Sequence, residues 1–229
     1  MTEVPTTRDR ILEAAAALLA DKGRDAVSTR AVSAAAGVQA PTLYRLFGDK
    51  DGLLDAVATF GFETYLAGKE ALRQSDDPVE DLRRGWDLHL EFGLARPAFY
   101  ELMYGSGRAA SPASKAAEEI LHRMITRIAD AGRLTTSVDR AVRIVEATGV
   151  GVVFTVIATP PSERDPGLPA QVREMVIGNI TTERPSTPDT GVHTRASALS
   201  EALRTGEFEA LSSAERRLLI EWLTRLANT

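Results

Sequence analysis

The sequence predicts an all-α protein, and three observations favour this class. Apolar residues recur at three- and four-residue spacing in nearly every segment, which is the period of a helix with one buried face. Pro78, Pro97 and Pro112 stand where such segments begin, and proline is favoured in the first helical turn. Only residues 149–158 would suit a buried strand, and no second strand-like segment could pair with them. We therefore expect a buried helix there.

Capping residues and glycines set the expected ends of the N-terminal helices. Thr6 or Thr7 caps the first helix, which ends at Gly23, and Ser28 caps the second, which stops at Gly37. Asp49 caps the fourth. Six of the 11 prolines fall between residues 160 and 188, which indicates loops at 159–169 and 182–191. The predicted helices span residues 7–22, 28–36, 40–47, 50–71, 78–95, 97–104, 113–131, 138–158, 170–181, 193–205 and 213–227.

Composition excludes several classes of function. Cysteine is absent and only His89, His122 and His193 could supply imidazole, so we expect no metal site, no cofactor and no catalytic residues. The sequence contains no catalytic motif, and we predict that the protein is not an enzyme. Each apolar stretch is shorter than the ~18 residues of a membrane span, and no signal peptide opens the chain. We expect a cytoplasmic protein without a membrane partner.

The charge distribution favours a nucleic-acid partner at one end of the chain. The formal net charge is −5, but the first fifty residues hold seven basic and six acidic side chains. Between residues 28 and 50, only Asp49 opposes Arg30, Arg45 and Lys50. A local basic face on an acidic protein can bind a phosphate backbone.

The two short helices at 28–36 and 40–47, joined by a turn with Gly37, have the form of a helix-turn-helix. On the second of them, Leu43, Leu46 and Phe47 share one face and are expected to pack on the first helix of the chain. The residues left toward the outside or the flank are Gln39, Ala40, Thr42, Tyr44 and Arg45. Short, polar and basic side chains suit a helix that enters a DNA groove.

Residues 27–30 and 36–54 resemble the DNA-binding signature of TetR-family transcriptional regulators, over roughly residues 7–55. The resemblance implies an all-helical homodimer with a DNA-binding domain at 1–50 and a larger domain at 51–229 that binds an effector and dimerises. It also implies that Arg30, Gln39 and Ala40 approach bases and that Thr29, Thr42, Tyr44 and Lys50 approach phosphates of double-stranded DNA. The chain departs from the family at Gln39, a poorer N-cap than Ser or Thr, and at Leu46. Taken singly, Tyr44 could also be an edge-of-core aromatic, and Arg30 and Lys50 solvated surface charges.

An aromatic cluster is the candidate effector site in the larger domain. Five of the chain's thirteen aromatic residues lie between Trp86 and Tyr104. Aromatic side chains with a few polar groups line many small-molecule sites, and core packing is the competing interpretation. The candidate ligand-binding residues are Trp86, His89, Phe92, Tyr100, Met103, Tyr104 and His122.

A recognition helix of two turns reads few base pairs, so we expect a homodimer on a palindromic operator. Two stretches could face the second subunit: residues 142–156, and the stripe of Leu219, Trp222, Leu223 and Leu226. The overall prediction is a repressor released by a small hydrophobic or aromatic effector. The alternative is a ligand-independent DNA-binding or protein-interaction module without an effector pocket.

Overall fold

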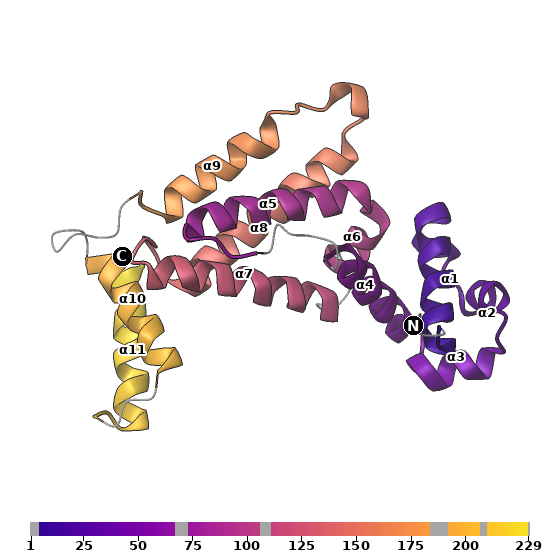
Figure 1. Cartoon of the computed structure of the whole chain (residues 1–229), viewed down its shortest axis with the longest axis horizontal. Coiled ribbons are helices and arrows are strands. Elements are labelled where there is room, and N and C mark those ends of the chain that lie inside the picture. Colours follow the sequence, from indigo (N-terminus) through magenta and orange to yellow (C-terminus); the bar gives the residue numbers. More distant parts are fainter. Residues whose placement is uncertain (1–4, 67–72, 106–110, 184–191, 207–209, 229) are drawn as a thin grey trace. The chain divides into compact units, whose positions relative to one another are not determined.

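The computed structural model describes residues 5–66, 73–105, 111–183, 192–206 and 210–228. Within these residues the regular structure is helical, and an isolated bridge joins Leu134 to Thr181 (Figure 1). This confirms the all-α prediction. The α-helices are α1 (Thr7–Lys22), α2 (Thr29–Ala36), α3 (Ala40–Phe47), α4 (Lys50–Leu66), α5 (Pro78–Ala95), α6 (Pro97–Tyr104), α7 (Pro112–Asp130), α8 (Val138–Ala158), α9 (Leu168–Ile180), α10 (Val192–Thr205) and α11 (Ser213–Ala227). Short 3₁₀ helices lie at Arg24–Ala26 and Pro161–Glu163.

Local capping explains why the predicted ends agree with the observed ones. The Thr6 hydroxyl accepts from the Asp9 N–H at 3.2 Å, and the Asp9 carboxylate accepts from the Thr6 N–H at 2.9 Å, which closes a capping box on α1. Ser28 caps α2 in the same sense, through the Ala31 N–H at 3.2 Å. The expected extension of α4 to residue 71 lies outside the described residues.

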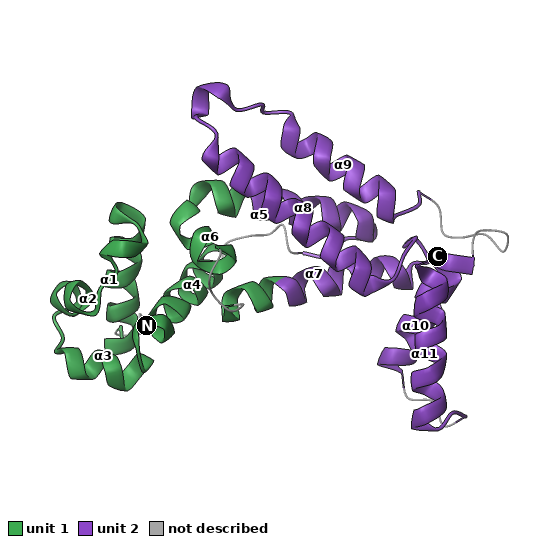
Figure 2. Ribbon diagram, turned by 180° about the vertical axis from the view of Figure 1, so that it is seen from behind, with its two compact units in different colours: residues 1–69, 91–117 green, residues 70–90, 118–229 purple. Residues whose placement is uncertain are grey.

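The chain divides into two compact units (Figure 2). The first consists of Met1–Lys69 and Glu91–Ala117, and the second of Glu70–Leu90 and Glu118–Thr229. The expected domain boundary at residue 50 stays a prediction.

The core of the first unit is built around α1, α4 and α6, because α1 contacts α4 and α6 and α4 contacts α6. Gly61 of α4 makes a close approach to α6: a Cβ placed there would lie 2.2 Å from Cδ1 of Phe99. A glycine is therefore required if the Phe99 ring is to keep its place against α4. The buried side chains of α1 and α4 are Ile11, Leu12, Ala15, Leu19, Leu53, Leu54, Val57, Ala58, Phe62 and Tyr65.

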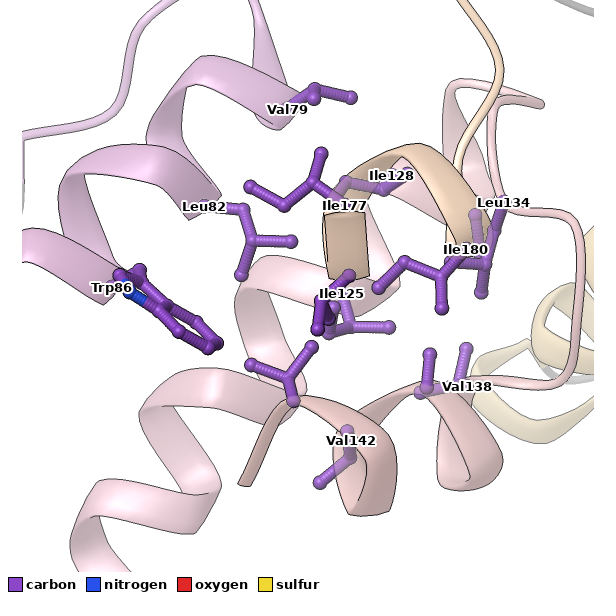
Figure 3. Close-up of a cluster of buried hydrophobic side chains, with 14 of the residues drawn as sticks. Val79, Leu82, Trp86, Ile125, Ile128, Leu134, Val138, Val142, Ile177 and Ile180 are labelled. Carbon is purple, nitrogen blue, oxygen red and sulfur yellow. The ribbon is translucent and has the colours of Figure 1, made fainter. Parts of the chain in front are cut away.

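The second unit has its own core, formed by side chains of α5, α7, α8 and α9 (Figure 3). Trp86 lies at one side of this cluster, and Ile125, Ile177 and Ile180 lie near its middle. The cluster as a whole contains side chains of all four helices, so the core holds them together through apolar burial. The segment 149–158 belongs to α8, as predicted, and not to a strand.

Helix α8 is also long and apolar enough to span a membrane by length and composition, with a mean hydropathy of 1.8 in its best window. Eight of its residues are buried among the other helices, and a third of that apolar window is buried. A core helix of a soluble protein passes the same hydropathy test.

A buried carboxylate joins the start of α5 to α7. Asp81 accepts hydrogen bonds from the Ser75 backbone and hydroxyl and pairs with Arg84 and Arg127. Burial would raise the pKa of Asp81, but the hydrogen bonds from Ser75 and Arg127 and the charge of Arg84 hold it below its usual value. Asp81 therefore stays ionised at neutral pH, where both arginines compensate its charge.

Helices α10 and α11 form a hairpin with a small core of its own. The hairpin is antiparallel, because His193 at the start of α10 bonds to the carbonyl of Leu226 at 2.8 Å and Arg216 donates to the carbonyl of Gly206 at 3.2 Å. The apolar side chains between the two helices are Ala196, Leu203, Leu211, Leu219, Ile220, Leu223 and Ala227.

Polar contacts attach this hairpin to the α7–α8 region. The Ser197 hydroxyl donates to the Thr136 carbonyl at 2.7 Å, and the Thr136 hydroxyl donates to the Asn228 side chain at 2.9 Å. Arg204 pairs with Asp139 at 3.4 Å. Hydrogen bonds of this kind are directional, so they set the position of the hairpin relative to α8.

Glu201 on α10 makes the stability of this attachment depend on pH. Its side chain is only 5% exposed, and burial raises its pKa, aided by Asp130 and Asp139 and opposed by Arg204 and His122. The folded chain therefore holds this proton more tightly than the unfolded chain does, so the ionised carboxylate costs stability at neutral pH. We expect Glu201→Gln to raise the melting temperature at pH 7. The wild-type protein should lose stability as the pH rises above 4.5, the ordinary pKa of a glutamate, because Glu201 ionises there, and the variant should lose less.

The control for Glu201→Gln is Glu221→Gln, because Glu221 is exposed on α11 and forms a surface pair with Arg225. Melting curves between pH 4 and pH 8 should shift for the first variant and stay within error for the second. A lower melting temperature of Glu201→Gln at pH 7 would show that ionised Glu201 is stabilising, contrary to this prediction.

Candidate nucleic-acid interface

Helices α2 and α3 are joined by a tight turn whose geometry requires glycine. Gly37 follows α2 with φ 65°, in the left-handed region, and the next N–H, of Val38, donates to the Ser33 carbonyl at 3.0 Å. Pro41 lies in the first turn of α3, where its missing N–H costs no helical hydrogen bond. The result is the predicted helix-turn-helix, with two short helices connected by three residues.

The inner face of α3 is narrower than the sequence indicated. Leu43 is fully buried, and Phe47 is half-buried with the Arg8 guanidinium 5.6 Å from its ring centroid. Leu46 is 37% exposed, so the expectation that it packs with Leu43 and Phe47 is wrong. Helix α3 has only two turns, so Leu43 and Phe47 suffice to attach it, and Leu46 lies at the edge of its buried face.

The junction from α3 to α4 is the tightest part of the domain. Gly48 has φ 79°, and Asp49 caps α4 by accepting from the Gly52 N–H at 2.8 Å. A Cβ at Gly52 would lie 2.1 Å from the carbonyl oxygen of Phe47. The absence of a side chain at Gly52 therefore lets α4 begin directly beside the last turn of α3, a requirement that the sequence analysis missed.

The outer face of this motif holds the predicted DNA-binding residues. Tyr44 is 52% exposed, which favours the outward position over the edge-of-core alternative. Gln39 is the N-cap of α3, and its side chain makes no capping hydrogen bond, as its residue type indicated. Arg30, Gln39, Ala40, Arg45 and Lys50 are exposed, and Thr29 and Thr42 are half-buried.

Residues 11–57 match the family model described as bacterial regulatory proteins, tetR family. These residues are thus similar to the N-terminal part of TetR-family regulators. The matched residues include all of α2 and α3, together with the turn between them. The helix-turn-helix thus lies within the part of the chain that matches this family of bacterial regulatory proteins.

Solved structures of other proteins share the fold of this chain. PfmR, a TetR family transcriptional regulator from Thermus thermophilus, is 27% identical, with 76% of this chain and 97% of PfmR covered at a TM-score of 0.52. A protein of unknown function from Rhodococcus sp. RHA1 is 21% identical over 79% of this chain and 98% of its own, at a TM-score of 0.65. TetR-Q116A from Acinetobacter baumannii AYE, in complex with minocycline, is 22% identical over 74% and 93%, at a TM-score of 0.56. A search of curated protein sequences found no significant match.

Four of the seven candidate ligand-binding residues lie in the first unit. Phe92, Tyr100 and Met103 are buried, Tyr104 is half-buried, and the rings of Tyr100 and Tyr104 lie 4.7 Å apart. The Phe92 and Tyr100 ring centroids lie 6.2 Å apart. These aromatic residues therefore form one cluster.

Two residues of α4 complete this aromatic cluster and were missed by the sequence analysis. The Phe92 ring lies 5.7 Å from that of Phe62, nearly perpendicular to it, and 5.0 Å from that of Tyr65. Such tilted and edge-on pairs are favourable arrangements for aromatic rings. The three-residue spacing of Phe62 and Tyr65 on one helix face was the available signal.

Trp86 and His89 lie in the second unit, beside Gly149 of α8. A Cβ at Gly149 would lie 3.6 Å from Nε2 of His89 and 3.7 Å from Cζ3 of Trp86, so both side chains face α8. Burial lowers the pKa of His89 to about 4, so its imidazole is neutral at physiological pH. A neutral imidazole can both donate and accept a hydrogen bond.

His122 takes part in a separate set of contacts. Its Nε2 lies 3.8 Å from Oδ1 of Asp139, and its Nδ1 lies 3.4 Å from the Thr126 hydroxyl. His122 therefore shares a carboxylate with α10, because Asp139 also pairs with Arg204 of that helix. Among the described residues, no group of three His, Asp or Glu side chains has an arrangement that could hold a metal ion.

Proposed function

We propose that the protein is a ligand-responsive repressor that binds a palindromic operator as a homodimer in the cytoplasm. The observation that carries this proposal is the outer face of α3, where Gln39, Tyr44 and Arg45 are exposed on a helix attached by Leu43. A helix attached by one side and polar on the other can enter a major groove without losing core contacts.

The roles on DNA divide by position. Gln39 and Ala40, at the N-terminal end of α3, and Arg30 are proposed to face base edges, where side chains discriminate sequence. Tyr44 and Lys50 are proposed to contact phosphates, which orient the protein without reading sequence. The remaining proposed contacts, to phosphates and to the DNA beside them, come from Thr29, Thr42 and Arg45.

A second subunit is part of this proposal because α3 has only eight residues. Two copies related by a two-fold axis present two such helices to half-sites about one DNA turn apart, ~34 Å. The palindrome of the operator then mirrors the symmetry of the dimer.

Helix α4 is the proposed connection between effector and DNA. Lys50 is its first residue, and Phe62 and Tyr65 near its other end belong to the aromatic cluster around Phe92. A helix of 17 residues is about 25 Å long and behaves as a rigid rod. An effector that repacks the aromatic rings would therefore displace Lys50 and the end of α3.

The proposed effector is a small hydrophobic or aromatic compound, because the cluster offers mostly aromatic surface. The fold neighbour from Acinetobacter baumannii was solved in complex with minocycline, and this supports a small-molecule effector. By linkage, an effector that prefers the conformation not bound to DNA lowers operator affinity by the same factor.

Selection of bound duplexes from a random pool tests the proposal. We expect an inverted repeat, bound with an affinity that falls steeply with salt. A screen of aromatic compounds against that operator should then find one that weakens binding. Tight operator binding that no compound changes would instead favour the ligand-independent module.

Lys50→Ala is expected to weaken binding to every duplex alike and to lower the slope of log affinity against log salt by about one unit per subunit. The reason is that one phosphate contact, and the counterion it releases, is lost. Lys115→Ala, at an exposed lysine of α7, is the matched control and should leave the slope unchanged. An unchanged slope for Lys50→Ala would remove its phosphate role.

Gln39→Ala is expected to act differently, by changing which sequence is preferred. Repeating the selection with this variant measures the change directly. Recovery of the same consensus, at equal stringency, would show that Gln39 does not read a base.

A further inference from the structure

An arginine continues the buried side of α1 beyond its last buried turn. The buried residues of this helix are Ile11, Leu12, Ala15 and Leu19. At about 100° per residue, the side chain of Arg8 lies within about 60° of each of them around the helix. Arg8 is exposed, because it lies almost one turn before the first of them. The side of α1 that packs on the rest of the domain thus ends in a positive charge at the surface.

The ring of Phe47 holds this charge at the end of α3. The guanidinium carbon of Arg8 lies over the ring, 5.6 Å from its centroid, and Phe47 is the last residue of α3. Attraction to the ring face positions the guanidinium, while its N–H groups, which lie in the guanidinium plane, remain able to donate hydrogen bonds. A side chain that is already held loses less conformational entropy when it binds an anion.

Arg8 therefore lies near the start of α4, where Lys50 is a proposed phosphate contact. Phe47 and Lys50 are three residues apart. Consecutive Cα atoms are separated by about 3.8 Å, so the Cα atoms of these two residues lie within ~11 Å of each other. Helix α1 thus adds a second cation at the junction at which α4 begins.

The acidic residues next to these two cations are used in helix capping. The Asp9 carboxylate accepts from the Thr6 N–H at 2.9 Å and from the Thr6 hydroxyl at 2.7 Å. The Asp49 carboxylate accepts from the Gly52 N–H at 2.8 Å. Within the part of the chain that the structure describes, neither Arg8 nor Lys50 forms an ion pair with a carboxylate. Both cations are therefore available to an anion from outside the protein.

We propose that Arg8 is a further contact to the DNA backbone, held in position by the ring of Phe47. This inference rests on the proposed DNA-binding function and assigns to it a residue of α1, outside the helix-turn-helix. The N–H groups of arginine form a planar fork that matches a phosphate, so two hydrogen bonds to one phosphate are available. A phosphate contact carries no sequence information, so Arg8 contributes to affinity and orientation and not to the choice of operator.

Arg8→Ala tests the contact in the full-length protein. We expect roughly tenfold weaker binding to the selected duplex, and a slope of log affinity against log salt that is lower by about one unit per subunit. Arg10→Ala is the matched control, because it removes the same charge from an exposed site about 200° around α1 from Arg8. Its slope should equal that of the wild-type protein. A lower melting temperature of Arg8→Ala with an unchanged slope would show that Arg8 only attaches α1 to α3, and would overturn the proposal.

Phe47→Leu tests whether the ring positions Arg8. Leucine keeps an apolar side chain at this half-buried site but offers no ring face. We expect the loss of the cation–π contact to lower affinity about two- to fivefold while the salt slope stays that of wild type, because the charge of Arg8 remains. In the Arg8→Ala background the same change should cost less by that factor. Equal losses in both backgrounds would show that the ring does not position Arg8.

Lys50→Ala, measured in the same titrations, separates this inference from the proposed function. If Lys50→Ala lowers the salt slope and Arg8→Ala does not, the Arg8 contact is wrong and the proposed DNA-binding function stands. If the wild-type protein selects no duplex and its affinity for DNA does not depend on salt, the Arg8 contact and the proposed function both fall.

Discussion

Gly52→Ala is expected to disrupt operator binding more than any exposed substitution on α3. The added methyl group would lie 2.1 Å from the Phe47 carbonyl oxygen, and a backbone atom cannot rotate away as a side chain can. The end of α3 must therefore move relative to α4, at a cost of about 1–3 kcal/mol for this overpacking. A loss of that size in the bound geometry corresponds to roughly a 5- to 150-fold lower affinity, measurable by titration against the selected duplex.

Gly151→Ala provides the matched control for Gly52→Ala. Gly151 is also helical, in α8, and a Cβ there meets no other described atom within 4 Å. Alanine at such a site should stabilise the helix by about 0.5–1 kcal/mol, because glycine loses more backbone freedom on folding. If both variants bind the operator like the wild-type protein, the close approach at Gly52 does not set the position of α3.

Phe92→Ala is expected to cause the largest loss of stability in the first unit. Phe92 is buried, and its ring contacts those of Phe62, Tyr65 and Tyr100. Truncation of a buried phenylalanine costs about 3–5 kcal/mol through lost burial and the cavity that remains. Chemical denaturation followed by circular dichroism should show the first unit unfolding at lower denaturant.

Two further variants show whether the loss of stability in Phe92→Ala comes from the aromatic cluster. Leu94→Ala lies on the same helix but is 38% exposed, so its cost should be within about 1 kcal/mol. Phe92→Leu retains most of the volume, and we expect it to keep operator binding without effector while weakening the response to the compound found by screening. Equal losses for Phe92→Ala and Leu94→Ala would show that the aromatic cluster contributes little to the fold.

Helix boundaries were predictable because their causes are local. The cap at Ser28, the left-handed glycine at Gly37 and the proline that opens α5 each act within a few residues. Apart from the C-terminal end of α4, which lies outside the described residues, the observed ends agree with the expected ones to within about two residues, and residues 149–158 are helical as expected. The outward position of Tyr44 also followed from spacing on α3.

Contacts between helices were not predictable in the same way. The spacing on α3 placed Leu46 with Leu43 and Phe47, yet the width of the buried face of α3 depends on how α2 and α4 pack against it. The aromatic cluster was anticipated from α5 and α6, but its members Phe62 and Tyr65 lie on α4, about thirty residues earlier in the sequence.

The sequence by itself determined the helical class, the limits of most helices and the DNA-binding motif, because caps, turns and periodicity are short-range effects. Only the tertiary structure decided which apolar stripes are covered. It separated Trp86 and His89, which face Gly149, from the aromatic residues around Phe92, and it left Trp222 exposed beside the buried Leu223. Burial depends on the docking of segments that are distant in sequence, and no local pattern encodes that geometry.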